Sequence, residues 1–253
     1  MVAAAVLSTP FWSTVTAQAA TTTNASVIYV STTGSDTAGT GTAANPYQTI
    51  SHAVAVAAPA TTIIFEPGTY EKSVTISKDV TLESDSSQKN AVANTAIDAT
   101  GFTNGIVVNG AGAAGTVISG LTVENANDHG IWVKDTSNVT VMGNVIDHNG
   151  LVPATIKTTA IQEDKSILLE GTAYSVVANN TVDNNTITNN FIPSVIVHRN
   201  TPGDVVDGNV VVGNTMSMNG PAKAVGDARP TGIALIGAVL PVTNDEGSRQ
   251  HDC

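Results

Sequence analysis

The segment from Gly130 to Asn149 most strongly constrains what this chain can fold into. It holds three short runs rich in β-branched residues, and the alternation of apolar and polar positions is typical of half-buried strands. Clusters of Asn, Asp, Gly and Ser at 135–138, 143–144 and 147–150 separate the runs and indicate turns. Three such short strands cannot bury an apolar face alone, so the segment must stack on copies of itself.

Copies of this pattern lie on both sides of the segment. Each begins with a short apolar run that leads to a second strand, at 105–125, 166–185, 195–214 and, for a last incomplete start, 232–235. We predict that Asn144, Asn180 and Asn209 occupy the same bend in successive copies. There, each side chain can hydrogen-bond the backbone of a neighbouring coil and satisfy turn amides that stacking buries.

The stacked pattern resembles the right-handed parallel β-helix of pectate-lyase-like proteins over roughly residues 60–240. The segment before it is similar to the start of secreted β-helix proteins in the motif Tyr29-Val-Ser, Gly34-Ser-Asp36, Gly39, Asn45-Pro46-Tyr47, Ile50, Ala53 and then Thr62 to Tyr70. The resemblance implies an all-β fold, a right-handed parallel β-helix (a solenoid) with a short N-terminal capping helix. It does not imply one activity, because this scaffold carries many.

The capping helix is expected between Asn45 and Pro59. Asn45 can cap such a helix, and Pro46 fits its first turn. One apolar stripe at helical spacing is formed by Tyr47, Ile50, Val54 and Ala57. This stripe would cover the apolar cross-section at the end of the solenoid.

We divide the chain into a signal peptide (1–19), a flexible leader (20–26), a parallel β-helix (27–244, with 27–60 as N-terminal cap and loop) and a disordered tail (245–253). An apolar run at the start and the small-residue site Ala17-Gln-Ala19 predict cleavage and a secreted, extracellular protein. No Lys or Arg precedes that run, so an alanine-rich leader is the alternative. After Asn244 the strand pattern stops, which indicates a truncated chain or a last coil covered by a partner, with self-association through this uncapped end as one outcome.

Composition limits the classes of partner. Charged residues make up 12% of the chain and hydrophobic residues 42%, which suits stacked strands and argues against disorder. With a net charge of −11 and only ten Lys and Arg residues, the chain cannot form a basic surface that runs along a phosphate backbone, so we expect no nucleic-acid partner. No stretch after the leader approaches the ~20 apolar residues of a membrane span. The acidic balance also disfavours a polyanion unless a cation or a local basic cluster meets it.

The strands that open each copy are, by the resemblance, the floor of a binding cleft. Alternation directs one set of their side chains inward: Ile106, Ile131, Ile167, Val195 and Ile233, with Val108, Val133, Leu169, Val197 and Leu235. The outward side chains form two columns: Val107, Trp132, Leu168, Ile196 and Ala234, and Asn109, Lys134, Glu170, His198 and Ile236. Coils stack about 4.8 Å apart, so Lys134, Glu170 and His198 would converge if their coils are consecutive.

This set of side chains suits a sugar polymer. An exposed Trp stacks on pyranose rings, and a Lys or His can take the proton whose loss begins β-elimination in a uronate. We therefore predict four catalytic residues, namely Lys134, His198, Glu170 and Arg199, and five that bind substrate, namely Trp132, Asn109, Asp135, Asp227 and Arg229. The sequence has no convincing metal-ligand spacing, and it leaves open a carboxylate-bound calcium ion as cofactor.

Two functions remain open from the sequence. One is a polysaccharide lyase-like protein that acts on or binds acidic polysaccharide along the outer face of one sheet. The other is a non-catalytic glycan-binding or structural module, which is favoured because the polygalacturonase and pectate-lyase signatures are missing. Asn127-Asp128-His129-Gly130 is only distantly similar to the Asp-Pro-His of alginate epimerases, and we interpret Asp128-His129 and Asp147-His148 as repeated turn pairs.

Overall fold

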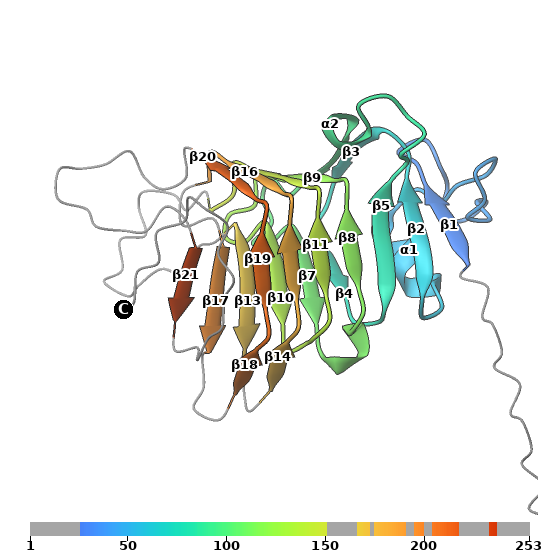
Figure 1. Ribbon diagram of the computed structural model, residues 1–253. Coiled ribbons are helices and arrows are strands. Elements are labelled where there is room, and N and C mark those ends of the chain that lie inside the picture. Colours follow the sequence, from blue (N-terminus) through green and yellow to red (C-terminus); the bar gives the residue numbers. More distant parts are fainter. Residues whose placement is uncertain are drawn as a thin grey trace, which may run out of the picture.

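The chain winds as a parallel β-helix, a stack of coils that runs from β1 at one end to β21 at the other (Figure 1). The structure is a computed structural model, and it describes residues 26–150, 166–172, 175–190, 195–199, 204–217 and 233–236. The predicted signal peptide and C-terminal tail lie outside these residues. In each complete coil the chain passes through three sheets, which we call sheets III, I and II in that order.

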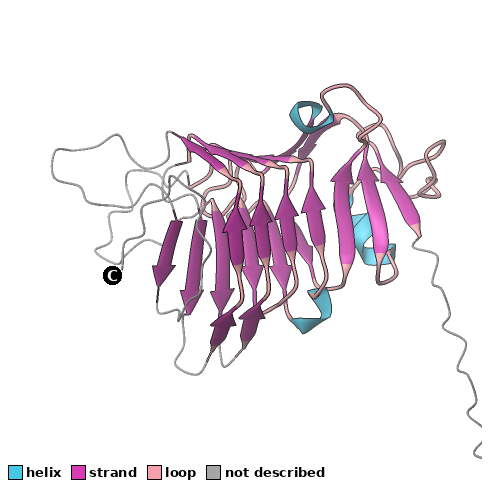
Figure 2. Cartoon of the chain, in the orientation of Figure 1, coloured by secondary structure: helices cyan, strands magenta, loops and turns pink. Residues whose placement is uncertain are grey.

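Strands dominate the described chain (Figure 2). Sheet I contains β1 (Val27–Val30), β2 (Thr61–Phe65), β5 (Val80–Ser84), β8 (Val117–Ser119), β11 (Thr140–Met142), β15 (Thr181–Asp183) and β19 (Val210–Val212). Sheet II contains β3 (Gly68–Glu71), β6 (Thr95–Asp98), β9 (Thr122–Glu124), β12 (Val145–Asp147), β16 (Thr186–Thr188) and β20 (Thr215–Ser217). Sheet III contains β4 (Val74–Ile76), β7 (Ile106–Asn109), β10 (Ile131–Lys134), β13 (Ile167–Gly171), β17 (Val195–Arg199) and β21 (Ile233–Ile236).

Smaller elements lie at the corners of the coils. The two-stranded sheet IV, β14 (Val176–Ala178) with β18 (Val205–Asp207), lies between sheets III and I in two coils. The helical elements are α1 (Ile50–Val56), α2 (Ala91–Asn94) and the 3-10 turn η1 (Ala111–Ala113). None of the helices in the described ranges combines the length and the apolar character that a membrane crossing needs.

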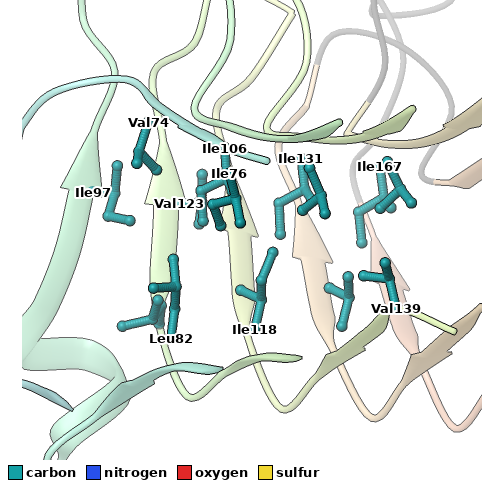
Figure 3. Close-up of a cluster of buried hydrophobic side chains, with 14 of the residues drawn as sticks. Val74, Ile76, Leu82, Ile97, Ile106, Ile118, Val123, Ile131, Val139 and Ile167 are labelled. Carbon is teal, nitrogen blue, oxygen red and sulfur yellow. The ribbon is translucent and has the colours of Figure 1, made fainter. Parts of the chain in front are cut away.

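The core is a set of apolar columns inside the coils (Figure 3). Val74, Ile106, Ile131 and Ile167 are register partners on consecutive coils, and all are buried. Each Val, Leu or Ile buried in this way contributes about 1.5–3 kcal/mol relative to exposure. The predicted inward set is confirmed at Ile106, Val108, Ile131, Val133, Ile167, Leu169, Val195, Val197 and Ile233. The side chain of Leu235 lies outside the described part.

Asparagine side chains join the coils at the bend between sheets I and II. The Oδ1 of Asn144 accepts from Leu121 N at 3.0 Å, and its Nδ2 donates to Ile118 O and to Asn185 Oδ1, both at 3.0 Å. Asn185 repeats the pattern on Asn214. These amides replace water as partners of buried turn backbone, which would otherwise remain unsatisfied.

The prediction that Asn144, Asn180 and Asn209 share one bend is confirmed for Asn180 and Asn209 and wrong for Asn144. Asn180 stacks on Asn209, at 2.9 Å from Nδ2 to Oδ1, at the bend between sheets IV and I. A third pair, Asn149 on Asn190, lies at the bend that leaves sheet II. Sequence spacing did not separate the bends because each follows a short alternating strand with the same Asn-rich turn chemistry.

The capping helix begins later than predicted. Its N-cap is Thr49, whose hydroxyl accepts from His52 N at 3.2 Å, and not Asn45, whose Nδ2 donates to Ala38 O. The carboxylate of Asp36 fixes the start of the helix by accepting from Gln48 N, Thr49 N and Thr49 Oγ1. Burial alone would raise the pKa of Asp36, but these hydrogen bonds bring it below its usual value.

We expect Asn144→Ala to lower the free energy of unfolding by about 2–4 kcal/mol, because it leaves a buried amide and a buried carbonyl without partners. Urea denaturation followed by circular dichroism measures this. The matched control is Asn109→Ala, at an exposed strand position, and it should change stability by less than about 0.5 kcal/mol. Equal effects at the two positions would contradict a structural role for the stacked asparagines.

Candidate functional site

The outer face of sheet III carries the two predicted columns in the predicted register. Trp132 pairs with Val107 on one side and with Leu168 on the other. Lys134 pairs with Asn109 and with Glu170, and Glu170 pairs in turn with His198. Side chains far apart in sequence therefore line up along one wall, as alternation within stacked coils requires. Ala234 and Ile236 continue the register on β21, and their side chains lie outside the described part.

Burial divides these columns into two parts. Leu168 is 1% exposed and Ile196 is 4% exposed, and Trp132 packs against this pair. Glu170 and His198 are also buried, with 3.3 Å between Glu170 Oε1 and His198 Nδ1. The positions at β13 and β17 are therefore not the open cleft floor that outward alternation suggested.

The accessible part of the wall lies at β7 and β10. Asn109 is exposed, and Trp132 and Lys134 are half-buried. The Lys134 ammonium nitrogen lies 4.8 Å from the centroid of the Trp132 ring, within the range of a cation–π interaction. The aromatic surface of Trp132 and the positive charge of Lys134 therefore lie side by side on this wall.

His129 completes this spot from the loop before β10. Its ring meets the edge of Trp132 at 5.2 Å between centroids and an interplanar angle of 74°. The His129 side chain is buried, and its Nδ1 lies 3.0 Å from Asp128 Oδ1. We therefore define the candidate site as Asp128, His129, Trp132 and Lys134, with Asn109 beside it.

The sequence interpretation of Asp128-His129 as a repeated turn pair is wrong. The carboxylate of Asp147 is on β12 in register with Glu124, so Asp147-His148 and Asp128-His129 occupy different positions in their coils. The exposure of the two imidazoles also differs, at 5% for His129 and 55% for His148. In the sequence, the one indication of the contact between His129 and Trp132 is that His129 lies just before a strand of the predicted cleft floor.

The other predicted site residues have different surroundings. Asp135 accepts hydrogen bonds from Thr172 N at 2.6 Å, Thr172 Oγ1 at 2.7 Å and Ser175 Oγ at 2.7 Å. This carboxylate therefore joins two coils at a corner, and its predicted contact with substrate stays a prediction. Arg199 is exposed at the end of β17. Asp227 and Arg229 lie outside the described residues.

Comparison with known proteins identifies the family to which this fold belongs. A family model described as "Right handed beta helix region" matches residues 49–220. The chain belongs to this right-handed β-helix family. The all-β fold predicted from the sequence is therefore confirmed, including its handedness. No curated protein sequence matches the chain.

Solved structures with this architecture are similar to the β-helix at low identity. A pectate lyase, Pel9A, is 16% identical with a TM-score of 0.51, over 83% of this chain and 61% of that one. ORF18 of Geobacillus virus E2 is 10% identical with a TM-score of 0.45, over 70% and 40%. A rhamnogalacturonan lyase is 12% identical with a TM-score of 0.37, over 84% and 62%. The chain spans less than two thirds of each of these proteins, and the likeness to the pectate lyase shows the fold.

Within the described ranges, no group of three or more His, Cys, Asp or Glu side chains is placed to hold a metal ion. Carboxylates of the β-helix do gather in a second column, on sheet II, where Asp98, Glu124 and Asp147 are register partners. Burial raises the pKa of Glu124, and the charges of Asp98 and Asp147 raise it further against a smaller opposite effect of His148. The pKa values of Asp98 and Asp147 are lowered instead, because hydrogen bonds outweigh burial.

Glu124→Gln should raise the melting temperature at neutral pH. The folded chain binds the Glu124 proton more tightly than the unfolded chain does, so ionisation destabilises the fold as pH rises past the usual pKa of 4.5. The difference from wild type should vanish in acid below that value, which thermal unfolding at several pH values would measure. Glu71→Gln is the control, since Glu71 is exposed in the same column. A lower melting temperature for Glu124→Gln at neutral pH would refute the destabilising role.

Proposed function

We propose that this β-helix binds an acidic polysaccharide along the outer face of sheet III and acts on it in the manner of a polysaccharide lyase. The observation that carries the proposal is the Lys134 ammonium 4.8 Å from the centre of the Trp132 ring, on an accessible part of that face. A flat aromatic surface binds the apolar face of a sugar at low entropic cost, and a cation beside it favours a sugar that carries a carboxylate. The structural similarity of this chain to a pectate lyase supports the same class of ligand, an acidic polysaccharide.

The chemistry would be β-elimination. A base takes the proton at C5 of a uronate, the electron pair forms the C4–C5 double bond, and the C4–oxygen bond breaks with a proton passing to the leaving oxygen. Lys134 on the accessible part of the wall is the base predicted from the sequence, and it would take this proton as the neutral amine, whereas its ammonium form binds the carboxylate. The ring of His129, which lies beside Asp128, contacts the edge of Trp132. Glu170 and His198 are buried, and their predicted catalytic roles stay predictions. Action on an extracellular polymer would also require the export predicted from residues 1–19.

Loss of the aromatic surface tests the binding site. Trp132→Ala should weaken the binding of polygalacturonate or alginate by about tenfold or more, because stacking and burial of the ring are lost. Affinity gel electrophoresis measures this, and Trp132→Phe should retain most of the binding. Met142→Ala is the matched control, because it removes a side chain that is 40% exposed on sheet I. Unchanged binding by Trp132→Ala would refute the proposed site.

Neutralisation of the cation tests the acidic character of the ligand. Lys134→Gln should weaken polyuronate binding about three- to tenfold at low salt and reduce its dependence on salt, since the lost term is electrostatic. Binding of a neutral polymer should not change. Lys89→Gln removes an exposed charge elsewhere and serves as the control. An equal loss for neutral and acidic polymers would show that Lys134 does not meet a carboxylate.

Release of unsaturated product separates the lyase from the non-catalytic alternative. Ultraviolet absorbance is followed on a panel of polyuronates, with and without added calcium. Product formed by wild type and lost in Lys134→Gln supports elimination. Binding through Trp132 without product on any polymer supports a glycan-binding module.

A further inference from the structure

A second aromatic side chain lies exposed on the corner that leads into the site. Phe102 is 40% exposed, whereas Phe65 is fully buried in the core. Phe102 belongs to the corner loop between β6 and β7, and β7 lies directly beside β10. Single exposed hydrophobic side chains are common on protein surfaces, so the case for Phe102 depends on its place next to the candidate site.

The corner loop of Phe102 is fixed to the corner loop that carries the candidate site. Asn127 N donates to Phe102 O at 2.9 Å, and Asp128 N donates to Thr103 O at 2.7 Å. In the return direction Gly105 N donates to His129 O at 2.9 Å. The loop of Phe102 and the loop of Asp128 and His129 therefore form one stacked wall beside Trp132.

Side chains strengthen the same wall. Asp98 Oδ1 accepts from Thr100 N, from Thr100 Oγ1 and, across the two loops, from Asn125 Nδ2 at 3.1 Å. A further contact joins His129 N to Asn104 Oδ1 at 3.3 Å. Phe102 is consequently presented by a backbone that a ligand does not have to order, which lowers the entropic cost of binding to it.

We infer that Phe102 is a second sugar-stacking position, which extends the proposed polysaccharide site from Trp132 toward the corner between sheets II and III. This inference rests on the proposed function. Phe102 precedes Val107, the register neighbour of Trp132, by five positions, so their Cα atoms lie at most roughly 18 Å apart, and the step to the next coil adds about 4.8 Å. A few sugar units span such a distance. The exposed side chains of Thr103 and Asn127 supply hydrogen-bonding groups for sugar hydroxyls beside the Phe102 ring.

The test measures affinity against ligand length by calorimetry with short and long oligogalacturonides. Wild type should bind the long oligomers more tightly than the short ones. Phe102→Ala should bind short oligomers as wild type does and lose about five- to tenfold in affinity for the long ones. Phe102→Tyr should retain the gain with length and Phe102→Leu should lose it, which keeps the comparison valid if the alanine variant folds poorly. Met142→Ala is again the control.

The outcomes separate this inference from the proposal on which it rests. If Trp132→Ala loses binding while the Phe102 variants bind all lengths as wild type does, only the second stacking position is refuted. If Phe102→Ala weakens all lengths equally, Phe102 does not form a separate position. If it changes the sedimentation of the protein but not its affinity, the ring is a contact between copies of the chain. If Trp132→Ala also leaves every affinity unchanged, the proposed function fails and this inference falls with it.

Discussion

From β8 onward, the stack depends on asparagine amides that replace water at the bends of its coils. A parallel solenoid buries the backbone of its turns, and the partners of that backbone must come from the neighbouring coil. Asn144, Asn185 and Asn214 supply both a donor and an acceptor at one bend, so each coil fixes the height and the register of the next. The amides add directional contacts between these coils to the apolar columns packed inside them.

Register lines up the outer face of sheet III, although most of the candidate site comes from β10 and the loop before it. Trp132 and Lys134 come from one strand, whereas Glu170 and His198 come from the next two, and their alignment follows from the pairing of β10, β13 and β17. The outer columns of sheet III have a buried part and an accessible part. Glu170 and His198 are buried beside the apolar Leu168 and Ile196 of the neighbouring column. The face is accessible where that column continues through Trp132 to Val107.

Much of this arrangement could be predicted from the sequence, because period-two alternation is a local property. It located the strands of sheet III, their inward residues and both outer columns. It missed β3 and β6, since Pro67 and Gly68 at the first, and small residues at the second, hide the alternation. The start of α1 was misplaced because Asp36 reaches Thr49 from a distant loop. Burial of Glu170 and the contact of His129 with Trp132 depend on tertiary packing, which no local pattern reports.

The bend between sheets I and II has a further consequence for how such a protein can diversify. After β8, β11 and β19 this bend has two residues and a left-handed first residue, at Gly120, Gly143 and Gly213, and an insertion there would break the asparagine contacts. The same bend holds ten residues and α2 between Ser84 and Thr95, in a coil that lacks those contacts. The corner between sheets II and III keeps the contact of Asn149 with Asn190 at its start and varies in length after it. The connection from Asp147 to Ile167 is far longer than the one from Asp98 to Ile106. Evolution can therefore lengthen or replace the chain beyond these asparagines and change the ligand of the solenoid, while the asparagine bends keep their own coils in place.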